Sequence, residues 1–209
     1  MKVLVACEES QRVCQSFRDA GHEAWSCDLL PTRGDHPEWH LQQDALVAAR
    51  AEAPTGGRWD LILAFPPCTH LSAAGARYWP AKRADGRQQA AVAFARAFMA
   101  CAPRVCVENP VGYLSTAWRK PDQMIHPYMF GEPFTKKTCL WLKDVPPLRP
   151  TDAVEPQFAW CHTSQRSGPR KDGSRPRARL PTQQRQPNSA RQRSQTFWCV
   201  ARAMAAQWG

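Results

Sequence analysis

The chain has 209 residues, 43% of them hydrophobic, and a net charge of +10, so its length fits one domain with a substantial core. No stretch approaches the roughly 20 apolar residues of a membrane helix, and the first residues do not read as a signal peptide; we therefore expect no membrane partner and a cytoplasmic location. The nine cysteines include no CxxC pair and no cluster with zinc spacing, which predicts reduced thiols and no metal site.

Predicted strands and helices alternate along the first half of the chain. The predicted strands span residues 2–6, 23–27, 59–65 and 104–107, and the predicted helices between them span 10–20, 44–53 and 87–102. Ser10 is expected to cap the first helix and Gly21 to end it. This alternation predicts an α/β fold with a Rossmann-like, doubly wound and mostly parallel sheet that helices cover on both faces.

The pattern changes in the second half of the chain. A further strand is predicted over residues 138–142, and residues 195–208 carry the amphipathic pattern of a helix. The interval between them is rich in proline, arginine and polar side chains and has little periodicity. We therefore divide the chain into an α/β domain over 1–145, a basic loop or small lobe over 146–192, and a C-terminal helix over 193–209 that packs back on the α/β domain.

Positive charge is concentrated in one segment of this second half. Between residues 161 and 195, nine arginine and lysine side chains are opposed by Asp172 alone, so this segment carries +8 and the rest of the chain +2. Such a segment is either a solvated loop or an arm that contacts the phosphates of a nucleic acid. Six of its members are candidates for that contact: Arg166, Arg170, Lys171, Arg175, Arg177 and Arg179.

Candidate reactive groups follow three of the predicted strands. Asp28 follows the second strand, Cys68 the third and Glu108 the fourth. In a doubly wound sheet these strand ends share one edge, so the three side chains are expected to converge on one cleft. Pro66 and Pro67 fix two φ angles before Cys68, which mounts a potential nucleophile on a rigid turn. Asp28 alone is equally well explained as a turn or cap residue.

Two motifs carry a resemblance to a known family. Residues 66–77 read Pro-Pro-Cys-Thr-His-Leu-Ser-Ala-Ala-Gly-Ala-Arg, and residues 108–110 read Glu-Asn-Pro. They resemble the catalytic loop and the Glu-Asn-Val motif of cytosine carbon-5 DNA methyltransferases. Residues 130–138 are similar, in weakened form, to the family's Tyr-Gly-x-Pro-Gln-x-Arg-x-Arg segment. The resemblance implies the sheet of S-adenosylmethionine-dependent methyltransferases, S-adenosylmethionine as cofactor, and double-stranded DNA with a flipped cytosine as partner.

The resemblance also implies roles for individual residues. Cys68 is the implied nucleophile at carbon 6 of cytosine, and Glu108 the implied contact to ring nitrogen 3 and the exocyclic amine. Asn109 is expected to orient Glu108, and Lys136 or Lys137 to hold the target phosphate or support the thiolate. The implied cofactor contacts are Cys7, Glu8, Asp28, Leu29, Asp44, Ala45 and Pro66, and the implied nucleic-acid contacts from the catalytic loop are Ser72 and Arg77.

Two departures from the family pattern keep alternatives open. The family's first strand leads into Phe-x-Gly-x-Gly-Gly, whereas residues 7–12 of this chain contain no glycine. The interval 143–192 is short for a target-recognition domain, which predicts weak or short sequence recognition. The alternatives are modification of cytosine carbon 5 in RNA or a free nucleotide, use of another one-carbon donor, and a non-catalytic relative that binds nucleic acid.

Overall fold

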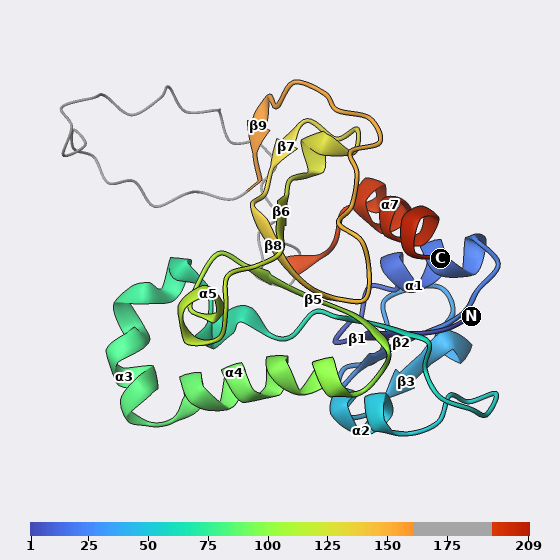
Figure 1. The fold of residues 1–209 in the computed structure, drawn as a ribbon, viewed down its shortest axis with the longest axis horizontal. Coiled ribbons are helices and arrows are strands. Elements are labelled where there is room, and N and C mark those ends of the chain that lie inside the picture. Colours follow the sequence, from blue (N-terminus) through green and yellow to red (C-terminus); the bar gives the residue numbers. More distant parts are fainter. Residues whose placement is uncertain (161–193) are drawn as a thin grey trace.

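A seven-stranded sheet forms the centre of the molecule (Figure 1). The computed structural model describes residues 1–160 and 194–209. The strand order is β3-β2-β1-β4-β5-β8-β6, in which the five strands from β3 to β5 run parallel and β8 is antiparallel to both of its neighbours. The strands span Lys2–Ala6 (β1), Glu23–Asp28 (β2), His40–Gln42 (β3), Leu61–Ala64 (β4), Arg104–Pro110 (β5), Gln123–Ile125 (β6) and Thr138–Lys143 (β8).

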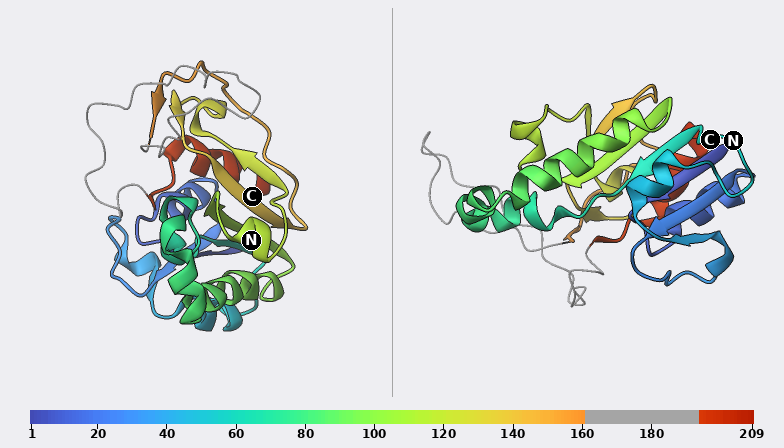
Figure 2. Two further views of the ribbon diagram at one scale, coloured as in Figure 1. Left: turned by 90° about the vertical axis from the view of Figure 1, so that its left-hand side faces the viewer. Right: turned by 90° about the horizontal axis from the view of Figure 1, so that it is seen from below.

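Helices cover both faces of the sheet, as Figures 1 and 2 show. Helices α1 (Arg12–Asp19) and α7 (Trp198–Trp208) pack on one face, and helices α2 (Ala45–Arg50) and α4 (Arg87–Ala97) pack on the other. The prediction of an α/β fold with a mostly parallel sheet is therefore confirmed. No helix in the described residues has the length and hydropathy that crossing a bilayer requires.

Side chains of the central strands alternate between two separate cores. In β1, Val3 and Val5 belong to the core under α1 and α7, whereas Leu4 and Ala6 belong to the core under α2 and α4. This alternation follows from the two-residue period of a strand. Because both faces are covered, both sets are apolar, and β1 reads as a continuous hydrophobic run.

Short elements connect the main ones and add a second, small sheet. Strands β7 and β9 pair in parallel beside β6 and β8, and helix α3 stands at one end of the molecule (Figure 1). The remaining elements span Pro37–Trp39 (η1), Cys68–His70 (η2), Ala73–Tyr78 (η3), Trp79–Ala84 (α3), Phe98–Ala100 (η4), Leu114–Ala117 (α5), Pro127–Met129 (η5), Phe134–Thr135 (β7) and Phe158–Ala159 (β9).

The predicted start of the first helix is wrong. Ser10 does not cap α1; the helix begins two residues later, after Gln11, whose backbone adopts a left-handed conformation with φ 57°. Gly21 does follow the helix in a left-handed conformation, with φ 86°, as its lack of a Cβ allows. The Glu8 carboxylate caps the helix in place of Ser10. It lies in the preceding turn and accepts hydrogen bonds from the N–H groups of Val13 and Cys14 in the first turn of α1.

Candidate functional site

The carboxyl ends of four neighbouring strands form one edge of the sheet. Ala6 of β1 pairs in register with Cys27 of β2 and Ala64 of β4, and Ala64 pairs with Val107 of β5. The next residue of each strand therefore lies in one row along this edge. That row consists of Cys7, Asp28, Phe65 and Glu108.

The predicted nucleophile sits in the turn that follows β4. Cys68 is half-buried and begins the 3-10 turn η2, and Pro67 before it has φ −52°. The Cys68 carbonyl accepts hydrogen bonds from the backbone N–H groups of Leu71, at 3.0 Å, and Ser72, at 2.8 Å. The two prolines and these two bonds give the turn little freedom.

Three side chains from three other elements hold the carbonyl groups of this turn. The amide nitrogen of Asn109, in β5, donates to the Pro66 carbonyl at 2.8 Å. The ammonium group of Lys82, in α3, donates to the Thr69 carbonyl at 2.6 Å, and the amide nitrogen of Gln88, in α4, donates to the His70 carbonyl at 2.9 Å. The role predicted for Asn109 was to orient Glu108; in the structure its contact is to the cysteine turn.

The larger of two cavities at this edge has a volume of about 490 Å³. Its size lies within the range of small-molecule sites, roughly 300 to 1,000 Å³. Five of the seven predicted cofactor contacts line it, together with residues of the cysteine turn and of α4. The lining residues are Cys7, Asp28, Leu29, Asp44, Ala45, Pro67, His70, Arg87, Ala90, Ala91 and Phe94.

Two carboxylates at one side of this cavity are oriented by backbone groups. Asp28 accepts from the Leu30 N–H at 3.0 Å. Asp44 caps α2, accepting from the N–H groups of Leu46 at 2.8 Å and Val47 at 3.1 Å. These aspartates are thus cap and turn residues and also line the cavity, so the two interpretations of Asp28 are compatible. Burial, reinforced by Asp28, raises the pKa of the Cys7 thiol, so this thiol stays uncharged beside the two aspartates.

Two of the predicted cofactor contacts, Glu8 and Pro66, do not line the cavity. Glu8 is buried and accepts hydrogen bonds from the N–H groups of Val13, at 2.8 Å, and Cys14, at 3.1 Å. Its carboxylate therefore occupies the N-terminus of α1, where a helix attracts negative charge. Pro66 contributes its carbonyl to Asn109, and it is Pro67 that faces the cavity.

The glycine-free turn after β1 has glycine-like backbone angles. Cys7 has φ 61° and Gln11 has φ 57°, in a region that residues with a Cβ rarely enter. Gln11 is held there by its side chain, which donates to the His36 carbonyl at 2.7 Å and accepts from the His36 N–H at 3.3 Å. The sequence supplies no glycine here, so tertiary contacts hold Gln11 in this left-handed conformation.

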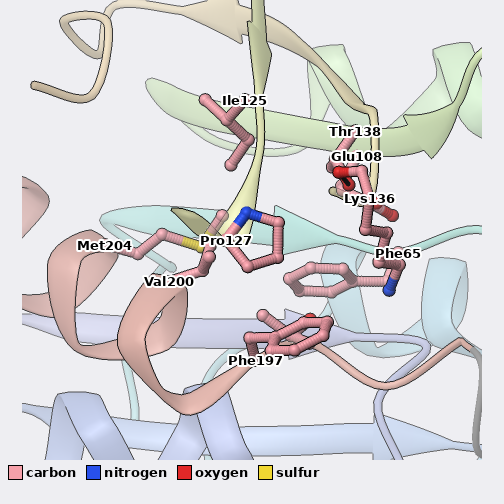
Figure 3. Close-up of a pocket in the computed structure, with 10 residues that line it drawn as sticks. Phe65, Glu108, Ile125, Pro127, Lys136, Thr138, Phe197, Val200 and Met204 are labelled. Atoms are coloured by element: carbon pink, nitrogen blue, oxygen red, sulfur yellow. Dashed lines mark hydrogen bonds between the residues drawn. The ribbon is translucent and has the colours of Figure 1, made fainter. Parts of the chain in front are cut away.

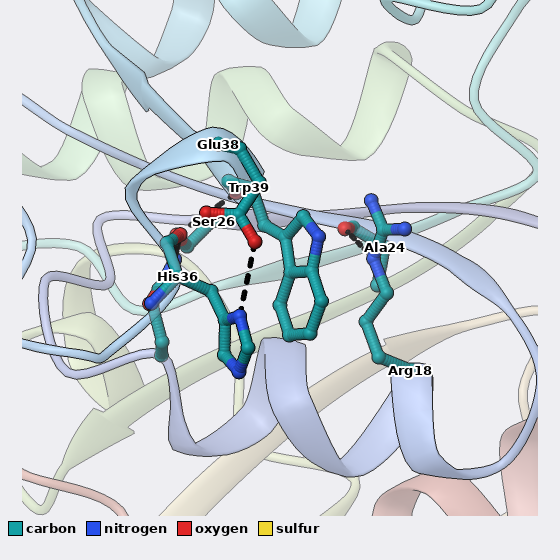
Figure 4. Close-up of polar contacts among 7 residues, drawn as sticks. Arg18, Ala24, Ser26, His36, Glu38 and Trp39 are labelled. Atoms are coloured by element: carbon teal, nitrogen blue, oxygen red, sulfur yellow. Dashed lines mark hydrogen bonds and ion pairs between the residues drawn. The ribbon is translucent and has the colours of Figure 1, made fainter.

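His36, Trp39 and Arg18 form a stacked cluster that holds the loop to which Gln11 is hydrogen-bonded. The His36 ring stacks on Trp39 with 3.6 Å between centroids, and the Arg18 guanidinium lies 4.9 Å from the Trp39 ring centroid. Figure 4 shows Trp39 between these two groups, with the Arg18 side chain donating to the Ala24 carbonyl at 2.7 Å. The cluster ties the loop to α1 and β2 behind the turn after β1.

The smaller cavity lies on the α7 side of the edge and has a volume of about 20 Å³, roughly the space of one water molecule. Figure 3 shows Glu108 and Lys136 on its wall, close to Phe65. Burial raises the pKa of Glu108, and the positive charge of Lys136 opposes that rise. The other lining residues are Ile125, Pro127, Thr138, Thr196, Phe197, Val200 and Met204.

The chain around the cysteine turn contributes to both cavities. Phe65 lines the smaller cavity, and Pro67 and His70 line the larger one, whereas Cys68 itself lines neither. The structure places Cys68 and Glu108 at the same edge of the sheet, as the sequence analysis expected.

Other predicted contacts lie away from both cavities. Lys137 is exposed, unlike Lys136, and lines neither cavity. Ser72 caps η3 by accepting from the Ala74 N–H at 3.2 Å, and the exposed Arg77 lies over the ring of Tyr78 at 4.5 Å. The six candidates of the basic segment lie outside the described residues: Arg166, Arg170, Lys171, Arg175, Arg177 and Arg179.

Several lining residues were not predicted as site residues. Phe65 ends the apolar run before the cysteine turn, and its position just before the two prolines is a signal that could have found it. Phe94 was taken for a core residue of a predicted helix, and His70 for a loop residue; only the packing of α4 and η2 against the sheet brings them to a cavity. In residues 1–160 and 194–209 no group of three or more histidine, cysteine or acidic side chains could hold a metal ion.

No family model matches the chain, and no curated protein matches it in sequence.

Proposed function

We propose that the chain is a DNA cytosine carbon-5 methyltransferase that uses S-adenosylmethionine. The observation that carries this proposal is that the Pro66-Pro67-Cys68 turn lies at a sheet edge with two cavities, one of about 490 Å³ that Pro67 and His70 line and a smaller one that Phe65 and Glu108 line. The strand order from β3 to β5 is the doubly wound order, and the reversed strand β8 beside β5 is compatible with the methyltransferase type of sheet that the sequence resemblance implies.

The larger cavity has the chemistry that an adenosyl cofactor needs. Asp28 and Asp44 accept hydrogen bonds and would take those of ribose hydroxyls and the adenine amine, while Phe94 and Leu29 give an apolar wall to the adenine ring. S-adenosylmethionine would supply an electrophilic methyl group, carried on a sulfonium, to the cytosine. The α1 N-terminus already holds the Glu8 carboxylate, so it offers no site for a cofactor phosphate.

Cys68 and Glu108 would perform the steps on the base. The Cys68 thiolate adds to carbon 6, which breaks the aromaticity of the ring and makes carbon 5 nucleophilic. Burial raises the pKa of Glu108 and so favours its protonated form, which would donate a hydrogen bond to ring nitrogen 3 and offset the charge that this addition produces. After carbon 5 has taken up the methyl group, its proton leaves to water, and the bond between sulfur and carbon 6 breaks to restore the ring and the thiolate.

The smaller cavity is too small for a pyrimidine as it stands. A volume of about 20 Å³ admits one water, so a flipped cytosine requires its lining to move. The ammonium group of Lys136 donates to the Gln195 carbonyl at 2.9 Å and lies 5.8 Å from the Phe197 ring. These contacts connect Lys136, which lies beside Glu108, to the chain just before α7. Entry of the base would break them.

The first experiment identifies the substrate. The protein is incubated with methyl-labelled S-adenosylmethionine and, separately, with duplex DNA, RNA or dCMP, and the products are analysed by mass spectrometry. Labelled 5-methylcytosine in DNA is expected. Label in RNA or dCMP alone would replace the DNA substrate with the corresponding alternative, and label in none of them would refute the proposed methyltransferase.

The second experiment tests the nucleophile. DNA that contains 5-fluorocytosine has no removable proton at carbon 5, so it should trap a covalent complex with the wild-type protein. Cys68→Ala should abolish trapping, whereas Cys101→Ala, which changes a half-buried cysteine beyond α4, should not. A trapped complex in Cys68→Ala would show that another residue attacks the base.

A further inference from the structure

Gln88 is a buried polar residue of α4, the helix that forms one wall of the larger cavity. It is fully buried, in a helix that otherwise turns apolar or small side chains toward the sheet. Its neighbours in α4, Arg87 and Ala91, line the cavity, but Gln88 itself does not. Burying an amide costs free energy unless it is hydrogen-bonded, so its position calls for a specific contact.

That contact is to the far end of the cysteine turn. The Gln88 amide nitrogen donates to the carbonyl of His70 at 2.9 Å, and His70 is the last residue of the turn that Cys68 begins. His70 also lines the cavity. His70 is therefore part of the cavity lining, belongs to the turn that Cys68 begins, and is held to α4 by Gln88.

Two buried polar atoms at this junction have no partner among the described residues: Nδ1 of His70 and Oε1 of Gln88. One nitrogen of a histidine ring can donate, and an amide oxygen accepts. Unpartnered buried groups of this kind destabilise the fold, because they have lost their hydrogen bonds to water. A ligand in the larger cavity that bonds to His70 removes part of that cost and fixes the ring.

The other tethers of the turn do not share this arrangement. Asn109 holds Pro66 from β5, and Lys82 holds Thr69 from the exposed helix α3. Neither Asn109 nor Lys82 belongs to an element that lines the larger cavity. Gln88 alone of the three joins a wall of that cavity to the turn.

We propose that Gln88 is a positioning residue that couples occupancy of the larger cavity to the placement of the Cys68 thiol, through His70. The proposal rests on the proposed function, because it takes the occupant to be S-adenosylmethionine or its product. It explains why an amide is buried at this point of α4. It also gives the protein an ordered reaction, in which the bound cofactor completes the placement of a thiol on an already rigid turn.

The test compares Gln88→Met with the matched variant Gln89→Met. Gln89 is exposed on the same helix, and its amide nitrogen donates to the Arg83 carbonyl at 3.1 Å, so its replacement controls for the loss of a glutamine from α4. Two quantities are measured with S-adenosylhomocysteine as the probe: its affinity by calorimetry, and the rate of Cys68 alkylation by iodoacetamide with and without it, read from the Cys68 peptide by mass spectrometry.

In the wild-type protein and in Gln89→Met, S-adenosylhomocysteine should change the alkylation rate of Cys68 about five-fold, the equivalent of one hydrogen bond. In Gln88→Met the affinity should stay within about three-fold, since the residue does not touch the cavity, and the change in alkylation rate should disappear. Simple shielding of the thiol by the ligand would survive the substitution. If Gln88→Met does not fold, Gln88→Asn keeps the amide but falls one methylene short of His70, and the same loss is expected.

Two results overturn the inference while leaving the proposed function intact. One is a Gln88 variant that binds S-adenosylhomocysteine and keeps the wild-type change in alkylation. The other is a wild-type protein that binds the probe with no change at Cys68. A wild-type protein that does not bind S-adenosylhomocysteine refutes the proposed cofactor itself, and the calorimetry alone reports that failure.

Discussion

Replacing Glu8 by glutamine should change the pH dependence of stability in a defined window. Burial raises the pKa of Glu8 from 4.5 to about 7, although the hydrogen bonds from Val13 and Cys14 and the charge of Arg12 oppose the rise. The folded protein therefore holds a proton that the unfolded chain has lost between pH 4.5 and about 7. Stability falls as the pH rises through this window, and above it the full penalty remains.

The magnitude follows from the size of the rise. A shift from 4.5 to about 7 corresponds to about 3 kcal/mol of lost stability at pH 8. Glutamine stays neutral but has one acceptor oxygen for the two N–H groups, which costs about 1 kcal/mol. Glu8→Gln should therefore be about 2 kcal/mol more stable than wild type at pH 8, or about 4–8 °C in Tm, and about 1 kcal/mol less stable at pH 4.5.

Urea denaturation of wild type and Glu8→Gln between pH 4.5 and 8.5 measures the pH at which the difference in their stabilities changes sign. Glu52→Gln, which changes an exposed carboxylate, is the control. A difference between Glu8→Gln and wild type that does not vary with pH would refute the buried, proton-holding carboxylate. The affinity for S-adenosylhomocysteine at pH 6 separates the two roles considered for Glu8. A cap of α1 predicts an unchanged affinity, and a direct cofactor contact predicts a loss.

Three further predictions concern the site. Gly112→Ala should destabilise the protein by more than about 2 kcal/mol and abolish activity, because a Cβ there would overlap the carbonyl that follows the cysteine turn. Gly75→Ala should be neutral in the same melting assay, because a Cβ there would meet its neighbours only at ordinary van der Waals distances. Asp44→Asn keeps a good cap for α2, so it should leave Tm unchanged while weakening S-adenosylhomocysteine binding about ten-fold by calorimetry. Lys136→Met removes the charge that lowers the pKa of Glu108, so the pH limb of the rate that depends on protonated Glu108 should move to higher pH. Lys137→Met should leave that pH limb in place. An unmoved limb in Lys136→Met would contradict the electrostatic interaction between Lys136 and Glu108.

The row of strand ends could be predicted from the sequence because it depends on the order of local patterns. The apolar run that ends at Ala64 and the one before Glu108 are strong signals of buried strands, and parallel pairing brings their ends to one edge. Asp28 follows from the same reasoning, whereas the cavity role of Asp44 was implied by the family resemblance. Their capping hydrogen bonds lie within three residues in sequence.

The remaining features depend on contacts between distant parts of the chain. Glu8 was predicted to contact the cofactor because the turn after β1 faces the cofactor in the family that the sequence resembles. Its burial and its hydrogen bonds to α1 depend instead on how that helix packs against the sheet. Lys136 and Lys137 are adjacent in sequence, and only the course of the chain into β8 decides which one faces Glu108. Gln88 gave no signal in sequence, since a glutamine in a helix is usually solvated, and its bond to His70 spans 18 residues.

The packing of α7 has a consequence for how the protein folds during synthesis. The core on one face of the sheet joins Val3 and Val5 of β1 and Phe17 of α1 to Met204 and Trp208 of α7. Because β1 is synthesised before α7, this side of β1 stays partly uncovered until α7 has been made. The exposed apolar face makes the nascent chain prone to aggregation during that interval, so chaperones that bind aliphatic segments are expected to bind β1 before α7 is complete.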